Sequence, residues 1–281
     1  MDDRDLSTFL ARADLDNWAD RILATEQQSL RLLPRSRGRR VARLGGKPRL
    51  PVGEAWPEAD DEPLAFIAEV DLAATRAVFG EEVLPSTGFL EFFYDAEQEA
   101  WGFDPTERLK WRVLWVEGRA PERALPRNLQ EDARFKSVDL EGRVDRTFAE
   151  WESWHIERLG MDREATHRYA EALNAWKEAQ NLNVGSVHRI LGHPDQIQGD
   201  MMVECQLASS GIDVGGLKPF RTEEADRLKA GTGEWRLLLQ VDSDEVSGMM
   251  WGDVGRIYYW IRHEDLQKGF WDRVWLVLQC T

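Results

Sequence analysis

Cysteine and basic residues are scarce in this sequence. Only Cys205 and Cys280 are present among 281 residues, without metal-type pairing beside either, so we expect buried thiols rather than a disulfide framework. The 36 Lys and Arg residues are outnumbered by 51 Asp and Glu residues, and the net charge is −15. This charge disfavours nonspecific binding to nucleic acid or to a membrane surface, and it favours solubility or a basic partner.

Long hydrophobic runs are also missing. No run approaches the length of a membrane span, and the first residues, MDDRDLSTFLARADLD, are acidic and lack the apolar core of a signal peptide. We therefore expect a soluble, cytoplasmic protein. Its hydrophobic content of 42%, with 13 Trp and 11 Phe, is enough for a sizeable core, so the composition argues against disorder.

Two stretches carry apolar residues at helical spacing. The first is predicted as helix over residues 3–30, and Pro34 ends this region. The second, Asp162–Leu182, places Tyr169, Leu173 and Trp176 on one stripe.

Six short apolar runs bounded by turn formers are predicted as strands. Within each group of three, the first run ends in Val-Asp and the second opens with Gly before an aromatic stretch. We interpret this as a degenerate duplication of a three-strand unit, with a Gly-Pro turn ahead of each copy at 45–48 and 192–194. The predicted strands are Leu64–Val70, Gly88–Tyr94 and Trp111–Glu117, then Trp235–Val241, Gly255–Ile261 and Arg273–Gln279.

The predicted fold class is α+β and mainly β. Strands in two clusters, with helices at the start and in the middle, favour a roll-like architecture of two related three-strand halves with N-terminal and central helices. We expect a single domain over residues 1–281. Its parts are an N-terminal helical segment at 1–33, a first β half at 40–117, a helical insert at 118–185 and a second β half at 186–281.

Several motifs occur in a fixed order: LGGKPRLP, PLAFIAEVDL and LPSTGFLEFFY, then HRILGHPDQIQGDM, then LLLQVDSD, MMWGDVGRIYYWI and VWLVLQC. Together they resemble the YwqG-like family of uncharacterised bacterial domains, over roughly residues 40–281. The resemblance implies a mainly-β, roll-like fold of two related halves, without an established enzymatic activity. It also implies that some relatives act as immunity proteins beside secreted bacterial toxins.

The candidate binding residues lie mostly in the second half. Carboxylates of the acidic turn 242–245, with Asp253, are ligands that hard cations accept, but the spacing of an EF-hand is missing and ordinary turn structure is the better interpretation. Trp251-Gly252-Asp253 can line a ligand pocket or form a packed loop whose Trp closes the core and whose Asp satisfies backbone donors. No metal or cofactor is predicted. The predicted binding residues are Gln240, Asp242, Asp244, Trp251, Asp253, His193, Gln198 and Asp200.

Catalytic motifs are weak. Ser243, Asp253 and His193 can be drawn as a hydrolase triad, but no Gly-x-Ser-x-Gly elbow marks the serine. The turn at 45–48, Gly-Gly-Lys-Pro, lacks the rest of a phosphate-binding loop and is interpreted as structural. The basic cluster Arg31–Arg43 is interpreted as a solvated strand face or a local ion-pair network rather than a nucleic-acid or phosphate site.

We therefore predict a non-catalytic protein-binding protein. In its most concrete form it is a cytoplasmic immunity protein that neutralises a bacterial toxin by occluding it. A basic partner suits the acidic chain, because complementary charge speeds encounter and raises specificity. The alternative is a small-ligand or metal-binding domain, or an undetected hydrolase, that uses the cleft near Asp242 and Asp253.

Overall fold

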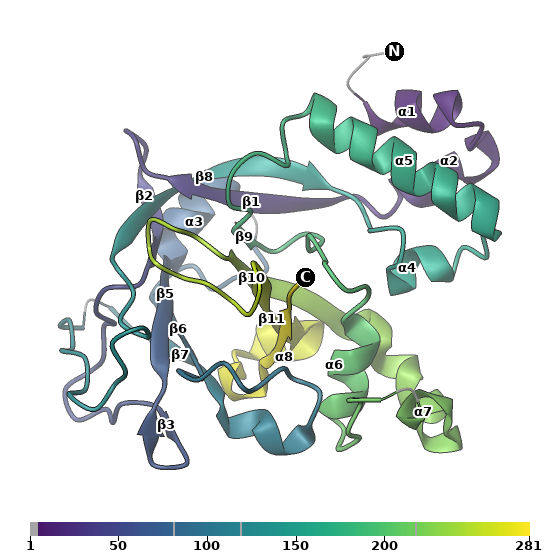
Figure 1. The fold of residues 1–281 in the computed structure, drawn as a ribbon. Coiled ribbons are helices and arrows are strands. Elements are labelled where there is room, and N and C mark those ends of the chain that lie inside the picture. Colours follow the sequence, from purple (N-terminus) through teal and green to yellow (C-terminus); the bar gives the residue numbers. More distant parts are fainter. Residues whose placement is uncertain (1–4, 81, 119, 217) are drawn as a thin grey trace.

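The computed structural model describes residues 5–80, 82–118, 120–216 and 218–281, and its dominant feature is one large curved antiparallel sheet (Figure 1). Within these ranges, ten strands form the sheet and two more form a separate hairpin, β3–β4. The strands are β1 (Gln27–Pro34), β2 (Arg40–Leu44), β3 (Glu58–Ala59), β4 (Glu62–Pro63), β5 (Ala65–Asp71), β6 (Phe89–Tyr94), β7 (Trp111–Val116), β8 (Val138–Thr147), β9 (Arg189–Ile190), β10 (Trp235–Asp242), β11 (Arg256–Arg262) and β12 (Trp275–Gln279).

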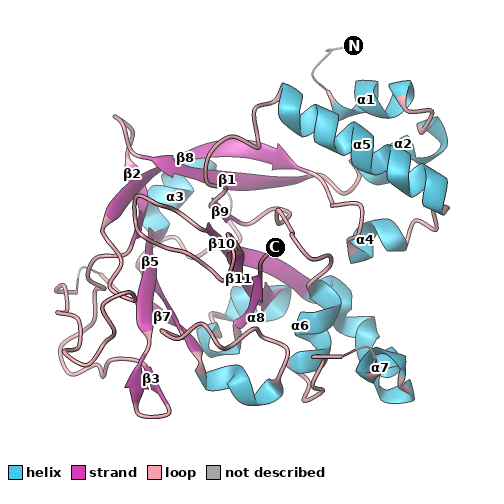
Figure 2. Cartoon of the chain, in the orientation of Figure 1, coloured by secondary structure: helices cyan, strands magenta, loops and turns pink. Residues whose placement is uncertain are grey.

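Eight α-helices lie within the described ranges, and α1, α2, α4 and α5 gather on one side of the molecule (Figure 2). None of them is long and apolar enough to cross a membrane. The helices are α1 (Leu6–Arg12), α2 (Asp16–Leu23), α3 (Leu72–Phe79), α4 (Trp154–Glu157), α5 (Arg163–Ala179), α6 (Met202–Ala208), α7 (Glu223–Leu228) and α8 (His263–Lys268).

The order of strands in the sheet is β12-β11-β10-β9-β1-β8-β2-β5-β6-β7, and every neighbouring pair is antiparallel. The long strands β1 and β8 pair over eight positions at the centre. The two-residue strand β9 joins β1 to β10. The C-terminal strands β10–β12 therefore attach to the rest of the sheet through β9.

The sheet curls until its two terminal strands approach each other, which makes it a nearly closed barrel. The rings of Trp111 on β7 and Trp275 on β12 meet edge to face at 4.9 Å, and Trp111 Nε1 donates to the carbonyl of Val274 at 2.9 Å. Within the described residues no strand pairing joins β7 to β12. Phe92 and Tyr259, from opposite walls, meet at 5.0 Å inside the core that the curl encloses.

The coarse prediction is confirmed, since the fold is mainly antiparallel β with helices. All six predicted strands are present, each with its ends within two residues of the prediction, and α5 confirms the predicted central helix. Asp162 caps α5 by accepting from the backbone N–H of Ala165 at 2.7 Å. The predicted stripe of Tyr169, Leu173 and Trp176 is buried.

The prediction of helix over residues 3–30 is wrong in its last part. Helix α2 ends at Leu23 and strand β1 begins at Gln27. The strand escaped detection because both of its faces are buried, so the sequence shows no alternation, and because Arg31 is buried within it. The guanidinium of Arg31 donates to three backbone carbonyls, those of Leu182, Val184 and Ser186.

The helical insert predicted at 118–185 also needs correction, because it contains the ten-residue strand β8. Its sequence, VDLEGRVDRT, has few apolar residues and a central glycine, which is unusual for a strand at the middle of a sheet. Gly142 leaves room for β1, since a Cβ atom at this position would lie 2.8 Å from the side chain of Leu30, which would have to shift. Pairing with both neighbours compensates for the weak strand propensity of β8.

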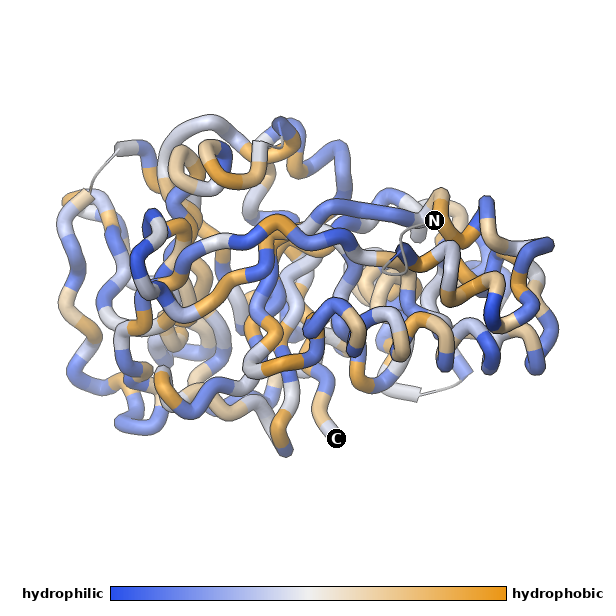
Figure 3. Tube along the Cα trace, turned by 90° about the horizontal axis from the view of Figure 1, so that it is seen from above, coloured by the Kyte–Doolittle hydropathy of each residue, from blue (hydrophilic) through white to orange (hydrophobic). Residues whose placement is uncertain are grey.

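The N-terminal and central helices form a layer with its own core. Helices α1 and α5 lie side by side, and their apolar faces pack with Phe148 and Ile156 apart from the core of the barrel (Figure 1). Hydrophobic and hydrophilic residues alternate at short intervals along most of the trace (Figure 3). Such alternation is expected where elements bury one face and expose the other.

The internal duplication stays a prediction. Strands β5–β6–β7 and β10–β11–β12 are both antiparallel three-strand units, and they occupy opposite ends of the sheet. In the sheet, β2 lies next to the first unit and β9 lies next to the second. A glycine at positive φ follows each of these two strands, Gly45 after β2 and Gly192 after β9. The helices differ, however, because α3 follows the first strand of one unit and α8 follows the second strand of the other.

Candidate functional site

The predicted binding residues occupy several places rather than one. Gln240 and Asp242 lie together on β10 in a buried charged network, whereas His193 and Asp200 line a small cavity beside α4. Trp251 is part of the barrel core. The remaining predicted residues are half-buried or exposed in loops: Asp244, Asp253 and Gln198.

Asp195 is the centre of the charged network, although sequence reasoning did not single it out. Its carboxylate accepts from Arg189 Nε at 2.9 Å and from Gln240 Nε2 at 3.0 Å, and its backbone carbonyl accepts from Arg256 at 2.8 Å. Burial alone raises the pKa of Asp195, but Arg189, Lys177 and Arg256 outweigh burial and hold that pKa well below its ordinary value. The network therefore fastens the Gly-x-Pro segment to the sheet.

Both carboxylate oxygens of Asp242 are held by other parts of the chain. Its carboxylate accepts from Arg256 Nε at 2.8 Å and from the backbone N–H of Val187 at 2.8 Å. The imidazole of His188 accepts from the backbone N–H of Asp242 at 3.0 Å, and burial lowers the pKa of His188 to about 4. Over the described parts of the chain, no group of three or more His, Cys, Asp or Glu side chains is placed to hold a metal ion.

The acidic turn confirms the turn interpretation. Asp244 accepts from the backbone N–H of Ser247 at 2.7 Å, and Ser243 Oγ donates to the carbonyl of Gly255 at 2.9 Å. These bonds hold the loop between β10 and β11 in shape. The hydrolase triad is not assembled. Ser243 Oγ bonds the carbonyl of Gly255, whereas the His193 ring bonds the carbonyl of Thr25.

Trp251 closes the core, as the packed-loop interpretation predicts. It is 1% exposed and meets the rings of Tyr94 and Phe135 edge to face. The companion prediction, that Asp253 satisfies backbone donors of the loop, is wrong. The Asp253 side chain is exposed, and the oxygen of Ser243 accepts from the backbone N–H of Trp251 instead, at 3.0 Å.

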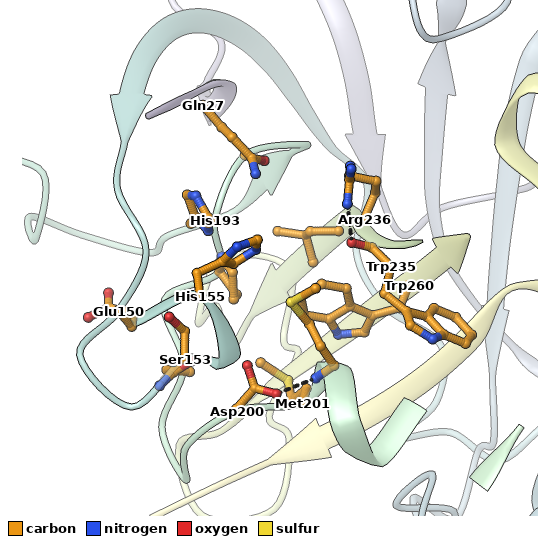
Figure 4. Close-up of a pocket in the computed structure, with 15 residues that line it drawn as sticks. Gln27, Glu150, Ser153, His155, His193, Asp200, Met201, Trp235, Arg236 and Trp260 are labelled. Atoms are coloured by element: carbon orange, nitrogen blue, oxygen red, sulfur yellow. Dashed lines mark hydrogen bonds between the residues drawn. The ribbon is translucent and has the colours of Figure 1, made fainter. Parts of the chain in front are cut away.

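A small cavity with several polar side chains lies where the Gly-x-Pro segment meets α4 and β10 (Figure 4). Figure 4 shows His155 and His193 next to each other at one wall, and their rings are perpendicular at 5.3 Å. His193 Nε2 and the carbonyl of Thr25 are 2.7 Å apart, so this nitrogen carries the proton of the neutral ring. Burial lowers the pKa of His193 to about 3, which keeps the ring neutral near pH 7.

The cavity has room for about one water molecule. Its volume is about 20 Å³, and a water needs some 10–15 Å³ of such space. Two donors of lining residues, Gln196 Nε2 and Trp260 Nε1, have no partner among the described residues. Ser153 Oγ caps α4 by accepting from Ile156 at 3.4 Å. The geometry suits a bound water rather than a substrate, because the space ends at these side chains.

A much larger groove runs beside β7, with a volume of about 620 Å³. Trp56, Trp115 and Trp271 supply its aromatic surface, and Trp115 is 39% exposed. Three carboxylates line it against a single guanidinium, that of Arg112. Sequence reasoning missed this site, although a tryptophan in the polar loop 51–58 was a usable signal. The carboxylates are those of Glu54, Glu58 and Asp272.

Comparison with known proteins identifies a family without assigning an activity. The model of a family described as "Domain of unknown function (DUF1963)" matches residues 42–280. This range nearly coincides with the stretch that carries the motif resemblance, and it leaves out α1, α2 and β1. An uncharacterised domain family is thus confirmed, whereas the YwqG-like label stays a prediction. A search of curated proteins found no match.

Proposed function

Because the chain belongs to the DUF1963 family of domains of unknown function, membership brings no activity with it, and we propose from the site geometry that the protein is a non-catalytic binder of a basic protein partner. The groove beside β7 is the binding surface of this proposal. It is the one candidate site with both size and suitable chemistry among those described above. The proposal extends to no reaction.

The single observation that carries the proposal is the composition of this groove. Exposed tryptophan is enriched in the energetically important centres of protein interfaces, and Trp115 and Trp56 border the groove with partly exposed rings. The surrounding carboxylates of Glu54, Glu58 and Asp272 attract basic side chains. The net charge of −15 acts in the same direction over a longer range.

The finer form of the proposal is a YwqG-like immunity protein that occludes a basic toxin inside the cell. Its support is the motif resemblance together with the acidic charge. The alternative, a ligand, metal or hydrolase site near Asp242 and Asp253, has less support, since both oxygens of Asp242 accept bonds from Arg256 and Val187 and Asp253 lies apart in an exposed loop.

The test compares two tryptophans with almost equal exposure. Trp115 borders the groove and is 39% exposed, whereas Trp151 lies beside α4 and is 40% exposed. Wild type, Trp115→Ala and Trp151→Ala are immobilised and presented with proteins of the source organism and with an inactive form of any neighbouring toxin. We expect an identified basic partner to bind wild type and Trp151→Ala but not Trp115→Ala, with all three equally folded by circular dichroism.

Salt dependence adds a second criterion for the same partner. Raising the salt from about 0.05 to 0.5 M screens steering beyond a Debye length of roughly 10 Å at 0.1 M. Association should therefore slow more than dissociation speeds up. A partner that binds Trp115→Ala as well as wild type, or an association rate that ignores salt, would refute the proposal.

A further inference from the structure

The charged side chains that line the groove beside β7 are not paired with one another or with other parts of the chain. Over the described residues, no ion pair or hydrogen bond reaches the carboxylates of Glu54, Glu58 and Asp272, which are all exposed. The same holds for the guanidinium of Arg112. The charged groups of this groove are therefore free to bind charges from outside the chain.

Another groove, lined by residues of β8 and α5, has a volume of about 510 Å³ and is built differently. There Arg143 is paired with Asp145 at 2.8 Å, and Arg146 is paired with Asp5 at 3.4 Å. Its charges satisfy one another, which leaves little for a ligand to bind. Unpaired charges are thus a property of the groove beside β7 and not of every groove on this surface.

The indole of Trp115 is held in place along the edge that carries its nitrogen. Its Nε1 donates to the carbonyl of Thr87 at 3.2 Å. The same edge lies against Gly88, where a Cβ atom would be 2.5 Å from Nε1 and where φ is +91°, so glycine is needed at this position. Because the polar atom is bonded and the residue is 39% exposed, Trp115 presents ring surface to solvent at a fixed place.

Several tryptophan rings elsewhere in the protein are covered by the chain's own arginines. The closest of these pairs, with the guanidinium carbon 4.4, 4.7 and 4.9 Å from the ring centroid, are Arg21 on Trp18, Arg158 on Trp154 and Arg262 on Trp235. Trp115 differs, since no cation from the described part of the chain lies over its ring. A partly exposed ring beside unpaired carboxylates is suited to a cation from another molecule.

A guanidinium suits this combination better than an ammonium group does. It is planar and can stack on the ring, and its fork of donors binds a carboxylate through two parallel hydrogen bonds. An ammonium group is a point charge that holds its water more strongly. Arg112 does not prevent such binding, because it precedes Trp115 by three residues on β7. At about 3.3 Å per residue their Cα atoms are about 10 Å apart, which is close to the Debye length at 0.1 M salt.

We propose that the groove recognises its partner through an arginine side chain, which stacks on Trp115 and forms a forked ion pair with a carboxylate of the groove. This inference rests on the proposed function and names the group of the partner that the groove selects. A lysine at the same place keeps the charge but loses the stacking and the second parallel hydrogen bond. The partner is therefore a protein with an exposed arginine, and positive charge alone is not sufficient.

The test uses a random library of twelve-residue peptides selected on the whole wild-type protein. Peptides that also bind Glu58→Lys/Asp272→Lys are discarded, and Glu171→Lys/Glu178→Lys, which alters two exposed carboxylates of α5, is the matched control. We expect each retained peptide to contain arginine and to bind the control variant as it binds wild type. Retained peptides whose basic residues are all lysine would overturn the proposal.

Replacing the arginines of a retained peptide by lysine, one at a time, then tests the selected group itself. Fluorescence polarisation of the labelled peptides measures affinity. One replacement should weaken binding to wild type about tenfold and should have little effect on binding to Trp115→Ala. Trp151→Ala, which alters a tryptophan of similar exposure outside the groove, should keep the tenfold difference.

Two results would overturn arginine recognition while leaving groove binding intact. One is equal binding of the arginine and lysine peptides to wild type, and the other is a tenfold difference that persists in Trp115→Ala. Recovery of no groove-dependent peptide would also overturn the inference. The comparison of Trp115→Ala with wild type on the whole partner would then decide the proposed function separately.

Discussion

Glu91→Gln should make the protein more stable, by an amount that grows with pH. Glu91 on β6 lies opposite Glu69 on β5, and the two carboxylates are 0% and 1% exposed. Glu69 is paired with three arginines, whereas both side-chain oxygens of Glu91 lack a partner among the described residues. The three arginines are Arg40, Arg43 and Arg49.

The direction follows from the pKa of Glu91. Burial, and then the charge of Glu69, raise this pKa from 4.5 to about 9. Between these values the folded protein holds a proton that the unfolded chain has released, so the free energy of unfolding falls as pH rises. The limiting slope is about 1.4 kcal/mol per pH unit, or about 2.7 kcal/mol between pH 5.5 and 7.5. The glutamine side chain of the variant has no such proton to release and keeps nearly the same shape.

The measurement is urea unfolding of wild type and Glu91→Gln at pH 5.5, 6.5, 7.5 and 8.5, followed by tryptophan fluorescence. The difference between the two proteins removes the contribution of titrating groups that do not interact with Glu91. We expect the advantage of Glu91→Gln to increase by about 2–3 kcal/mol from pH 5.5 to 7.5. Glu69→Gln serves as a contrast, because it removes the carboxylate that pairs with the buried Arg43 and should lose about 3–5 kcal/mol. A pH-independent difference for Glu91→Gln would refute the reasoning.

Three further predictions concern the barrel and its loops. Asp195→Asn should cost about 3–5 kcal/mol at pH 7, measured by urea unfolding, because it leaves Arg189 buried beside a neutral group; a loss below about 1 kcal/mol would contradict the network. Trp251→Ala should cost about 3–5 kcal/mol in the same assay, since a large ring leaves the core, and unchanged stability would contradict its packing. Calorimetric titration with Ca²⁺, Mg²⁺ and Zn²⁺ should detect no site tighter than about 10⁻⁴ M; a micromolar site lost in Asp242→Asn or Asp253→Asn would contradict this.

The sequence was most informative at the two ends of the sheet. The strands of β5–β7 and β10–β12 are short, apolar and bounded by turns, so local signals suffice to predict them. The centre could not be predicted in this way. Strand β1 buries Arg31 against carbonyls more than a hundred residues away, and β8 carries charges and Gly142, so pairing over long distances overrides local propensity in both.

Local sequence signals could not predict the candidate site, for a similar reason. The groove brings together a loop at 54–58, the strand at 112–115 and a turn at 269–272, and only the curl of the sheet makes them neighbours. Of the residues that the motifs did single out, Asp242 is bonded to Val187 and Arg256, and Trp251 is buried in the core. Polar residues at a turn look the same in a sequence whether they bind a ligand or shape the backbone.

The position of β1 has a practical consequence for the choice of boundaries in recombinant expression. The matched range begins at residue 42, yet β1, at Gln27–Pro34, is bonded to β8 on one side and to β9 on the other. A recombinant fragment that begins at the family boundary would lack β1. Its sheet would be divided into two parts, and β9 and β8 would each have an unpaired edge. Such a fragment is expected to collect in inclusion bodies, since unprotected edges recruit strands from other chains. Expression of this protein should therefore start upstream of residue 27.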